Sequence, residues 1–205
     1  MLGTPLTGTA SARSRPDSSP CRSETWTRWS AIADEIQTGL GRTGRMFARD
    51  HEGVRPDVLV LGKALSGGFY PVSAVIASRD VLDVFGPGSH GSTYGGNPLA
   101  CAVARAAIRV VIEEQLPERA AQSGSWLLER LREIRSNALV DVRGKGLLVG
   151  LELRGMARSY CEQLLKLGVL AKETHAHTIR LAPPLIVSQD DLAWLVKQLS
   201  LVLGD

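Results

Sequence analysis

Lys63 is the residue whose surroundings in this sequence most clearly suggest chemistry. It follows the apolar stretch VLVLG, residues 58–62, which predicts a buried β-strand. Ligands bind at the carboxyl ends of the strands of an open α/β sheet, and an amine partly removed from water there loses some preference for its charged form. The uncharged amine attacks carbonyl carbon. Lys63 is therefore a candidate for Schiff-base formation, with a solvated surface lysine as the alternative.

Asp34 lies near the end of a second short apolar stretch, AIADE, at residues 31–35. A buried carboxylate needs a cation or hydrogen-bond donors, and a protonated pyridine nitrogen would satisfy it. Opposite charges about 4 Å apart at an effective dielectric of about 20 attract by roughly 4 kcal/mol, or about three pKa units. That attraction would keep a pyridine ring protonated at neutral pH. An aspartate that caps a turn before a loop is the alternative interpretation.

Two further segments are candidates for binding anions. The glycine-rich SHGSTYGGN, residues 89–97, precedes a predicted helix and offers hydroxyls and backbone amides to a phosphate, although a plain connector would look similar. Arg180 lies between Ile179 and Leu181 in the apolar alternation TIRLAPPLIV, so its guanidinium needs an anion. A substrate carboxylate held by paired hydrogen bonds and a structural ion pair are both compatible with that position.

Other chemistries are disfavoured by the spacing of their residues. GLGRTG, residues 39–44, matches G-x-G-x-x-G, but the turn-rich RMFARDHEGVRPD that follows lacks the helix and acidic residue that a dinucleotide site requires. The histidines have no carboxylate or cysteine partners at metal-ligand spacing. The 3 cysteines are widely separated and form no CxxC, which fits a reducing compartment.

The composition favours a soluble protein with small-molecule partners. Hydrophobic residues make up 44% of the chain, charged residues 22%, and the net charge is +3, values near the averages for globular proteins. The basic residues are not clustered with aromatic ones, so no nucleic-acid partner is expected. Apolar runs are well short of the roughly 20 residues that cross a membrane, and the start lacks a secretory signal. We expect a cytoplasmic location.

The patterning divides the chain into three parts. Residues 1–30 are rich in Ser, Thr, Arg and Pro and are interpreted as a disordered or unrelated leader, because the prolines argue against an amphipathic transit peptide. Residues 31–135 predict part of an α/β domain, with strands at 31–35, 58–62 and 71–78 and helices at 78–85, 98–115 and about 117–136. Residues 136–205 predict a small α+β domain: two strands around a glycine turn, a helix ended by Gly168, strands VLAKE and TIRLAP, and a final helix capped by Ser188.

Five segments together resemble the class III pyridoxal-phosphate aminotransferases: DEIQTGLGRTG, LGKALSGGFYPVSAV, HGSTYGGNPLACAVA, VRGKGLL and TIRLAPPLIV. The resemblance extends from about residue 31 to the C-terminus. It implies an α/β fold, the C-terminal part of the pyridoxal-phosphate transferase fold type I, with part of the large mixed-sheet domain and the small α+β domain. Within the family, LGKALSGGFYPVSAV and LAKETHAHTIRLAPPLIV are more similar to the enzymes that act on ornithine than to those that act on acetylornithine or 4-aminobutyrate.

The resemblance implies a role in cofactor binding for five residues. Lys63 would hold pyridoxal 5'-phosphate covalently and would also move the proton at the substrate carbon, while Asp34 would pair with the pyridine nitrogen. Gln37 would hydrogen-bond the phenolic oxygen. Thr93, helped by Ser92, would bind the phosphate of the cofactor held by the opposite subunit of a homo-oligomer.

The same resemblance implies the substrates, and it leaves part of the enzyme unaccounted for. Arg180 would bind the α-carboxylate of glutamate or 2-oxoglutarate, in a reaction that moves the δ-amino group of ornithine to 2-oxoglutarate. The family's first strands and its main phosphate-binding turn have no counterpart here, and residues 1–30 do not resemble them. We therefore expect an unpaired edge strand and a separately encoded N-terminal half as partner, with an inactive remnant of a split gene as the alternative.

Overall fold

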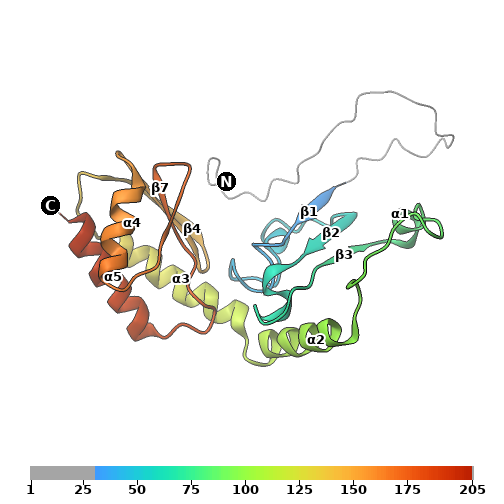
Figure 1. Cartoon of the computed structure of the whole chain (residues 1–205). Coiled ribbons are helices and arrows are strands. Elements are labelled where there is room, and N and C mark those ends of the chain that lie inside the picture. The colour runs from blue at the N-terminus through green and yellow to red at the C-terminus, as the bar shows by residue number, and fades with distance from the viewer. Residues whose placement is uncertain (1–30, 205) are drawn as a thin grey trace, which may run out of the picture.

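The computed structural model describes residues 31–204, which form two β-sheets connected by two long helices (Figure 1). The first sheet has the order β1-β2-β3. Its strands are β1 (Ile32–Asp34), β2 (Val58–Leu61) and β3 (Ala74–Ala77). β1 and β2 are parallel, and β3 is antiparallel to β2. Within residues 31–204 β1 pairs with β2 alone, so it is an edge strand of this sheet.

The first sheet is held to its helices by a small apolar cluster. Leu59 and Leu61 of β2 contribute to this cluster together with Leu40, Leu65 and Ala104, and all five are buried. Leu65 belongs to the short 3-10 helix η2 (Lys63–Ser66), and Ala104 to the helix α2 (Pro98–Glu113). α2 packs directly on η2, so the element that begins with Lys63 lies between the strand end and a long helix.

The second sheet is entirely antiparallel, with the order β4-β5-β7-β6. Its strands are β4 (Leu139–Lys145), β5 (Leu148–Leu153), β6 (Lys172–Thr174) and β7 (Thr178–Leu181). Two helices pack against this sheet, α3 (Leu116–Arg132) and α4 (Ala157–Lys166), and a third, α5 (Gln189–Leu203), packs against both of them. The largest core lies here, and Leu127, Leu131 and Ile179 are fully buried in it.

The helix starts follow the predicted capping chemistry. Asn97 precedes α2, and its side chain accepts a hydrogen bond from the Ala100 amide at 2.9 Å. Ser188 precedes α5 and accepts from the Asp191 amide at 3.1 Å. Both side chains satisfy an amide that has no partner within the helix, so short local signals determine where these two helices begin.

Several predicted elements are shorter than expected, among them the strand predicted at 71–78, which is β3 at Ala74–Ala77. The helix predicted at 78–85 is the single turn α1 (Arg79–Leu82), which ends three residues before the Gly-Pro-Gly sequence at 86–88. The strand predicted from Val169 begins only at Lys172. Val169 instead closes the end of α4, since its amide donates to the Leu164 carbonyl at 2.9 Å after Gly168 turns at φ +86°.

The GLGRTG segment leads into turns and the 3-10 helix η1 (Ala48–His51), so the helix that a dinucleotide site requires is absent within 39–51. The GLGRTG segment instead contacts the second sheet at its β4–β5 turn. The Leu147 amide, in the β4–β5 turn, donates to the Arg42 carbonyl at 3.0 Å.

Among residues 31–204, no helix combines the length and the apolar character that a membrane-spanning segment needs.

Candidate functional site

Lys63 is held in an uncommon backbone conformation directly after β2. Gly62 is extended, and Lys63 then has φ +44°, in the left-handed region. This conformation costs a non-glycine residue roughly 1–2 kcal/mol. The turn continues through Gly67 and Gly68, which also have positive φ. Such strain persists only where the surrounding structure imposes it, and it concentrates at functional sites.

Gln37 and Asp34 lie at the same edge of the sheet as Lys63. The Lys63 Nζ atom donates a hydrogen bond to Gln37 Oε1 at 3.1 Å. Asp34 is aligned with Val60 in the parallel β1–β2 register, and the Glu35 amide donates to the Val60 carbonyl at 2.9 Å. Because parallel strands end at one edge, an amine, an amide and a carboxylate are grouped there although β1 and β2 are distant in sequence.

The expected burial of Lys63 and Asp34 is wrong for this chain, in which both residues are exposed. Asp34 belongs to β1, an edge strand that pairs with β2 alone within residues 31–204, while Lys63 lies in the turn after β2 and lines a cavity. Asp34 Oδ1 accepts from the Ile36 amide at 3.0 Å, which is the turn-capping arrangement that the sequence left open. That single bond leaves a carboxylate with further acceptor capacity at this edge.

A cavity of about 760 Å³ joins Lys63 to the glycine-rich loop before α2. Ser92 lines it and accepts a hydrogen bond from the Gly95 amide at 2.9 Å. Phe69 and Tyr94 also line it and are strongly exposed. Thr93 is exposed beside this cavity without lining it. The loop therefore presents hydroxyls and amides close to the Lys63 amine.

Arg180 lies in the other sheet and does not line the Lys63 cavity. The alternation is as expected: Ile179 and Leu181 are buried and Arg180 is half-buried. In the register of β7, Arg180 is opposite Lys172, and like charges in that position repel. The carboxylates of residues 31–204 form no ion pair with it, and the neighbouring Glu173 is bound to Arg158 at 3.0 Å. Both observations leave Arg180 suited to an external anion.

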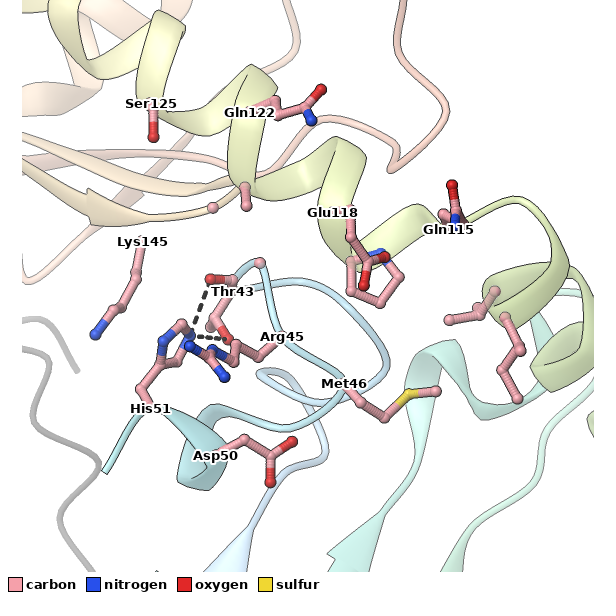
Figure 2. A pocket seen from close by; sticks show the side chains of 16 residues that line it. Thr43, Arg45, Met46, Asp50, His51, Gln115, Glu118, Gln122, Ser125 and Lys145 are labelled. Carbon is pink, nitrogen blue, oxygen red and sulfur yellow. Dashed lines mark hydrogen bonds between the residues drawn. The ribbon is translucent and has the colours of Figure 1, made fainter. Parts of the chain in front are cut away.

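A second cavity, of about 980 Å³, lies between the 43–51 segment, α3 and the β4–β5 turn (Figure 2). His51 Nε2 lies 3.1 Å from the Thr43 carbonyl and 3.2 Å from its hydroxyl. Partial burial lowers the pKa of His51, and the positive charges of Lys145 and Arg45 lower it further. The six predicted site residues do not line this cavity.

Within residues 31–204 no group of three His, Cys, Asp or Glu side chains is arranged to hold a metal.

The sequence did not reveal the part played by Glu35. Its side chain is 4% exposed, and its Oε1 accepts from the Arg49 amide at 2.8 Å, while its other oxygen accepts from the Thr38 hydroxyl. Glu35 thus holds the segment that follows Gln37. Strand periodicity places adjacent residues on opposite faces, which is a signal that Asp34 and Glu35 differ. It does not say which of them is buried.

The family model for class III aminotransferases matches residues 29–203, nearly the whole of the structure described above. The chain belongs to the class III aminotransferase family. An ornithine aminotransferase of Bacillus cereus (strain Q1) is 58% identical over 173 residues, which are 84% of this chain and 44% of that protein. This class III aminotransferase chain therefore spans less than half the length of that relative.

Solved structures of the family confirm the expected α/β fold. An acetylornithine aminotransferase from Elizabethkingia anophelis has a TM-score of 0.80 and 48% identity, over 84% of this chain and 47% of that one. The ornithine aminotransferase of Toxoplasma gondii, described with partial occupancy of pyridoxal phosphate at its active site, has a TM-score of 0.80 and 41% identity, over 83% of this chain and 42% of that one. The class III fold recognised from the sequence is thus confirmed.

Proposed function

We propose that this chain is the lysine-bearing C-terminal part of an ornithine aminotransferase. The reaction would transfer the δ-amino group of ornithine to 2-oxoglutarate, giving glutamate 5-semialdehyde and glutamate. The observation that carries the proposal is the position of Lys63 at the carboxyl end of β2, hydrogen-bonded to Gln37 and on the same sheet edge as Asp34. Since the chain covers 44% of its Bacillus cereus relative, we include an N-terminal half as a required partner.

Pyridoxal 5'-phosphate fits the residues at this edge. Its aldehyde needs an amine and its ring nitrogen a carboxylate, which Lys63 and Asp34 would supply. Gln37 accepts from Lys63 through Oε1, so its amide hydrogens remain available to the phenolic oxygen. Ser92 and Thr93 have hydroxyls for the phosphate on an exposed loop, a position that supports contact with the opposite subunit of a homo-oligomer. When bound, the cofactor supplies an electron sink for the substrate carbon.

The protein's own groups would hold the substrate and move its proton. The uncharged Nζ of Lys63 would take a proton from the substrate carbon that bears the amino group. Lys63 would then return the proton to complete the half-reaction. Arg180 would bind the α-carboxylate of glutamate or 2-oxoglutarate, a role supported by its lack of a carboxylate partner within residues 31–204.

The activity is tested by co-expressing this chain with the N-terminal half of the Bacillus cereus relative. We expect a complex that binds pyridoxal phosphate and forms glutamate 5-semialdehyde from ornithine and 2-oxoglutarate, and we expect Lys63→Ala to abolish turnover. Halves that stay separate and bind no cofactor would support the inactive-remnant alternative instead.

The amino donor is tested in the same preparation by comparing kcat/KM for ornithine and for acetylornithine. The 48% identity to an acetylornithine aminotransferase makes acetylornithine the second candidate. A preference for acetylornithine would retain the aminotransferase proposal and replace its substrate.

The position of the reactive amine is tested without turnover. The full chain is mixed with pyridoxal phosphate, reduced with borohydride and digested, and the label is mapped by peptide mass. We expect the label on Lys63. Equal labelling of a Lys63→Ala chain, or label spread over surface lysines, would contradict the assignment.

A further inference from the structure

Arg42 bonds to the second sheet through both its backbone and its side chain. The Arg42 carbonyl accepts from the Leu147 amide at 3.0 Å, and Arg42 Nη1 donates to the Leu147 carbonyl at 3.1 Å. The same nitrogen also donates to the Pro183 carbonyl. Burial lowers the pKa of Arg42 from its ordinary value, but a guanidinium stays charged at neutral pH. Its charge-assisted bonds to carbonyl oxygens are therefore retained.

The two carbonyls that Arg42 bridges lie at the end of the strand pair that carries Arg180. β5 and β7 pair Val149 with Leu181 and Gly150 with Arg180. Continuing this antiparallel register by two residues brings Leu147 opposite Pro183. Pro183 is followed by Pro184, and two prolines restrict the backbone dihedrals of this segment. The guanidinium thus caps the strand pair three residues, about 10 Å of extended chain, from Arg180.

The segment that carries Arg42 is also bonded and packed to the surroundings of the first sheet. The Gly39 amide donates to the Glu35 carbonyl at 3.0 Å, and the Gly41 amide donates to the Met46 carbonyl at 3.2 Å. Leu40 is 4% exposed in the apolar cluster of β2 and η2. Arg42 therefore bonds to the end of one sheet from a loop anchored beside the other.

Glycines allow close backbone contact between the Arg42 loop, the β4–β5 turn and α3. A Cβ atom on Gly146, whose φ is +54°, would lie 2.5 Å from the Thr43 carbonyl carbon and 2.7 Å from the Arg42 oxygen. A Cβ atom on Gly124 of α3 would lie 2.1 Å from the Gly146 oxygen. Contacts this close leave little room for sliding, so the relative placement of the two sheets depends on a few specific bonds.

We propose that Arg42 is a positioning residue, which fixes the strand pair carrying Arg180 relative to the sheet edge carrying Lys63. Its catalytic consequence rests on the proposed function, in which Lys63 acts at one end of a substrate whose carboxylate Arg180 binds. A substrate of fixed length requires a fixed distance between these two groups. Arg42 would set that distance without touching the substrate.

The placement is tested by a distance distribution between spin labels in the full chain. Cys101 is exposed on α2, which packs on η2, and Lys166→Cys provides a second site on α4, which packs on the second sheet. Cys21→Ser removes a competing thiol, and Cys161 is buried. We expect a narrow distribution for the native Arg42 chain and at least a doubled width for Arg42→Met, which keeps the side-chain length and removes the donor.

Matched variants separate the bonding role from a general loss of structure. Arg42→Lys keeps a charged donor and should recover part of the narrow distribution. Arg45→Met removes an exposed guanidinium from the same loop and should leave the width unchanged. Should Arg42→Met fail to fold by circular dichroism, Arg42→Leu, which also lacks a donor, replaces it with the same expectation. An Arg42→Met or Arg42→Leu width equal to the native width would overturn the proposal, as would a broad native distribution.

The consequence for substrate binding is measured in the complex with the N-terminal half. We expect Arg42→Met to raise the KM for 2-oxoglutarate about tenfold with a smaller change in kcat, because carboxylate binding is affected more than proton transfer. Borohydride labelling of Lys63 should be unchanged. An unchanged KM together with a widened distribution would overturn the catalytic consequence. Absence of activity in the native complex would instead count against the proposed function, and the spin-label distances would still decide the placement.

Discussion

The Nζ atom of Lys63 donates to the Oε1 atom of Gln37 across 3.1 Å, although the two residues are 26 positions apart. Each follows one of two adjacent parallel strands, so the pairing of β1 with β2 creates the contact. The bond orients the amine toward the sheet edge and leaves the Gln37 amide hydrogens free to donate. A change in the charge of residue 37 should therefore change the protonation of the Lys63 amine directly.

Gln37→Glu should slow the reaction of Lys63 with pyridoxal phosphate. A carboxylate favours the charged ammonium, and only the uncharged amine attacks an aldehyde. In an exposed site the attraction is about 1 kcal/mol, so we expect roughly a fivefold lower rate of borohydride-trapped labelling at pH 7. Gln37→Leu, which removes the bond without adding charge, is the control. Equal labelling rates for Gln37→Glu and the unmodified chain would contradict this effect.

Arg180→Gln should weaken the binding of carboxylate substrates in the complex with the N-terminal half. A hydrogen bond to a charged group contributes about 1.5–3 kcal/mol, which corresponds to a rise in KM for 2-oxoglutarate of roughly 10- to 100-fold. Lys172→Gln removes the cation opposite Arg180 in the register and serves as the control, with a smaller expected rise. If the two variants have the same KM, the assignment of Arg180 fails.

Gly146→Ala should destabilise the contact between the two sheets. The added Cβ would lie within 2.7 Å of three backbone atoms of the 42–44 segment, and overpacking of this kind costs about 1–3 kcal/mol beyond the left-handed backbone term. Gly53→Ala is a matched control, because Gly53 has φ +63° but nothing within 4 Å of the new atom. Denaturant titration should show the larger loss for Gly146→Ala, and equal losses would exclude a packing effect.

The free energy of unfolding should decrease when the pH falls below about 7, in part through His51. Burial and the charges of Lys145 and Arg45 place the pKa of folded His51 below its ordinary value of 6.5. The unfolded chain therefore binds more protons in this range, so stability rises with pH there. Above the pKa of His51 in the unfolded chain, its contribution to the free energy of unfolding is fully present. That contribution is lost as the pH falls through the pKa of His51 in the folded chain.

His51→Gln tests this pH dependence, since glutamine does not titrate but can still donate to the Thr43 carbonyl. Urea denaturation between pH 5 and pH 7.5, a window around the ordinary histidine pKa of about 6.5, should show a shallower slope for His51→Gln. His90→Gln changes an exposed histidine outside the cavity and should keep the full slope. An unchanged slope for His51→Gln would assign the dependence to other groups.

Local signals in the sequence determined much of this fold. The apolar run before Lys63, the capping residues Asn97 and Ser188, and the alternation around Arg180 each predicted an element that the structure contains. These signals work because a strand's faces and a helix's first turn depend on residues only a few positions apart. Residue types, their spacing and the family resemblance also predicted the roles of six site residues, and these roles stay predictions. The six are Lys63, Asp34, Gln37, Ser92, Thr93 and Arg180.

The tertiary structure alone decided which polar residues are buried and where the two sheets meet. Asp34 and Glu35 are neighbours with similar chemistry, yet the first is exposed and the second is 4% exposed. GLGRTG resembled a nucleotide loop, but its arginine bonds to residues 105 and 141 positions away. Such contacts depend on how separate elements pack, and no periodicity or spacing within a segment records the position of a partner a hundred residues distant.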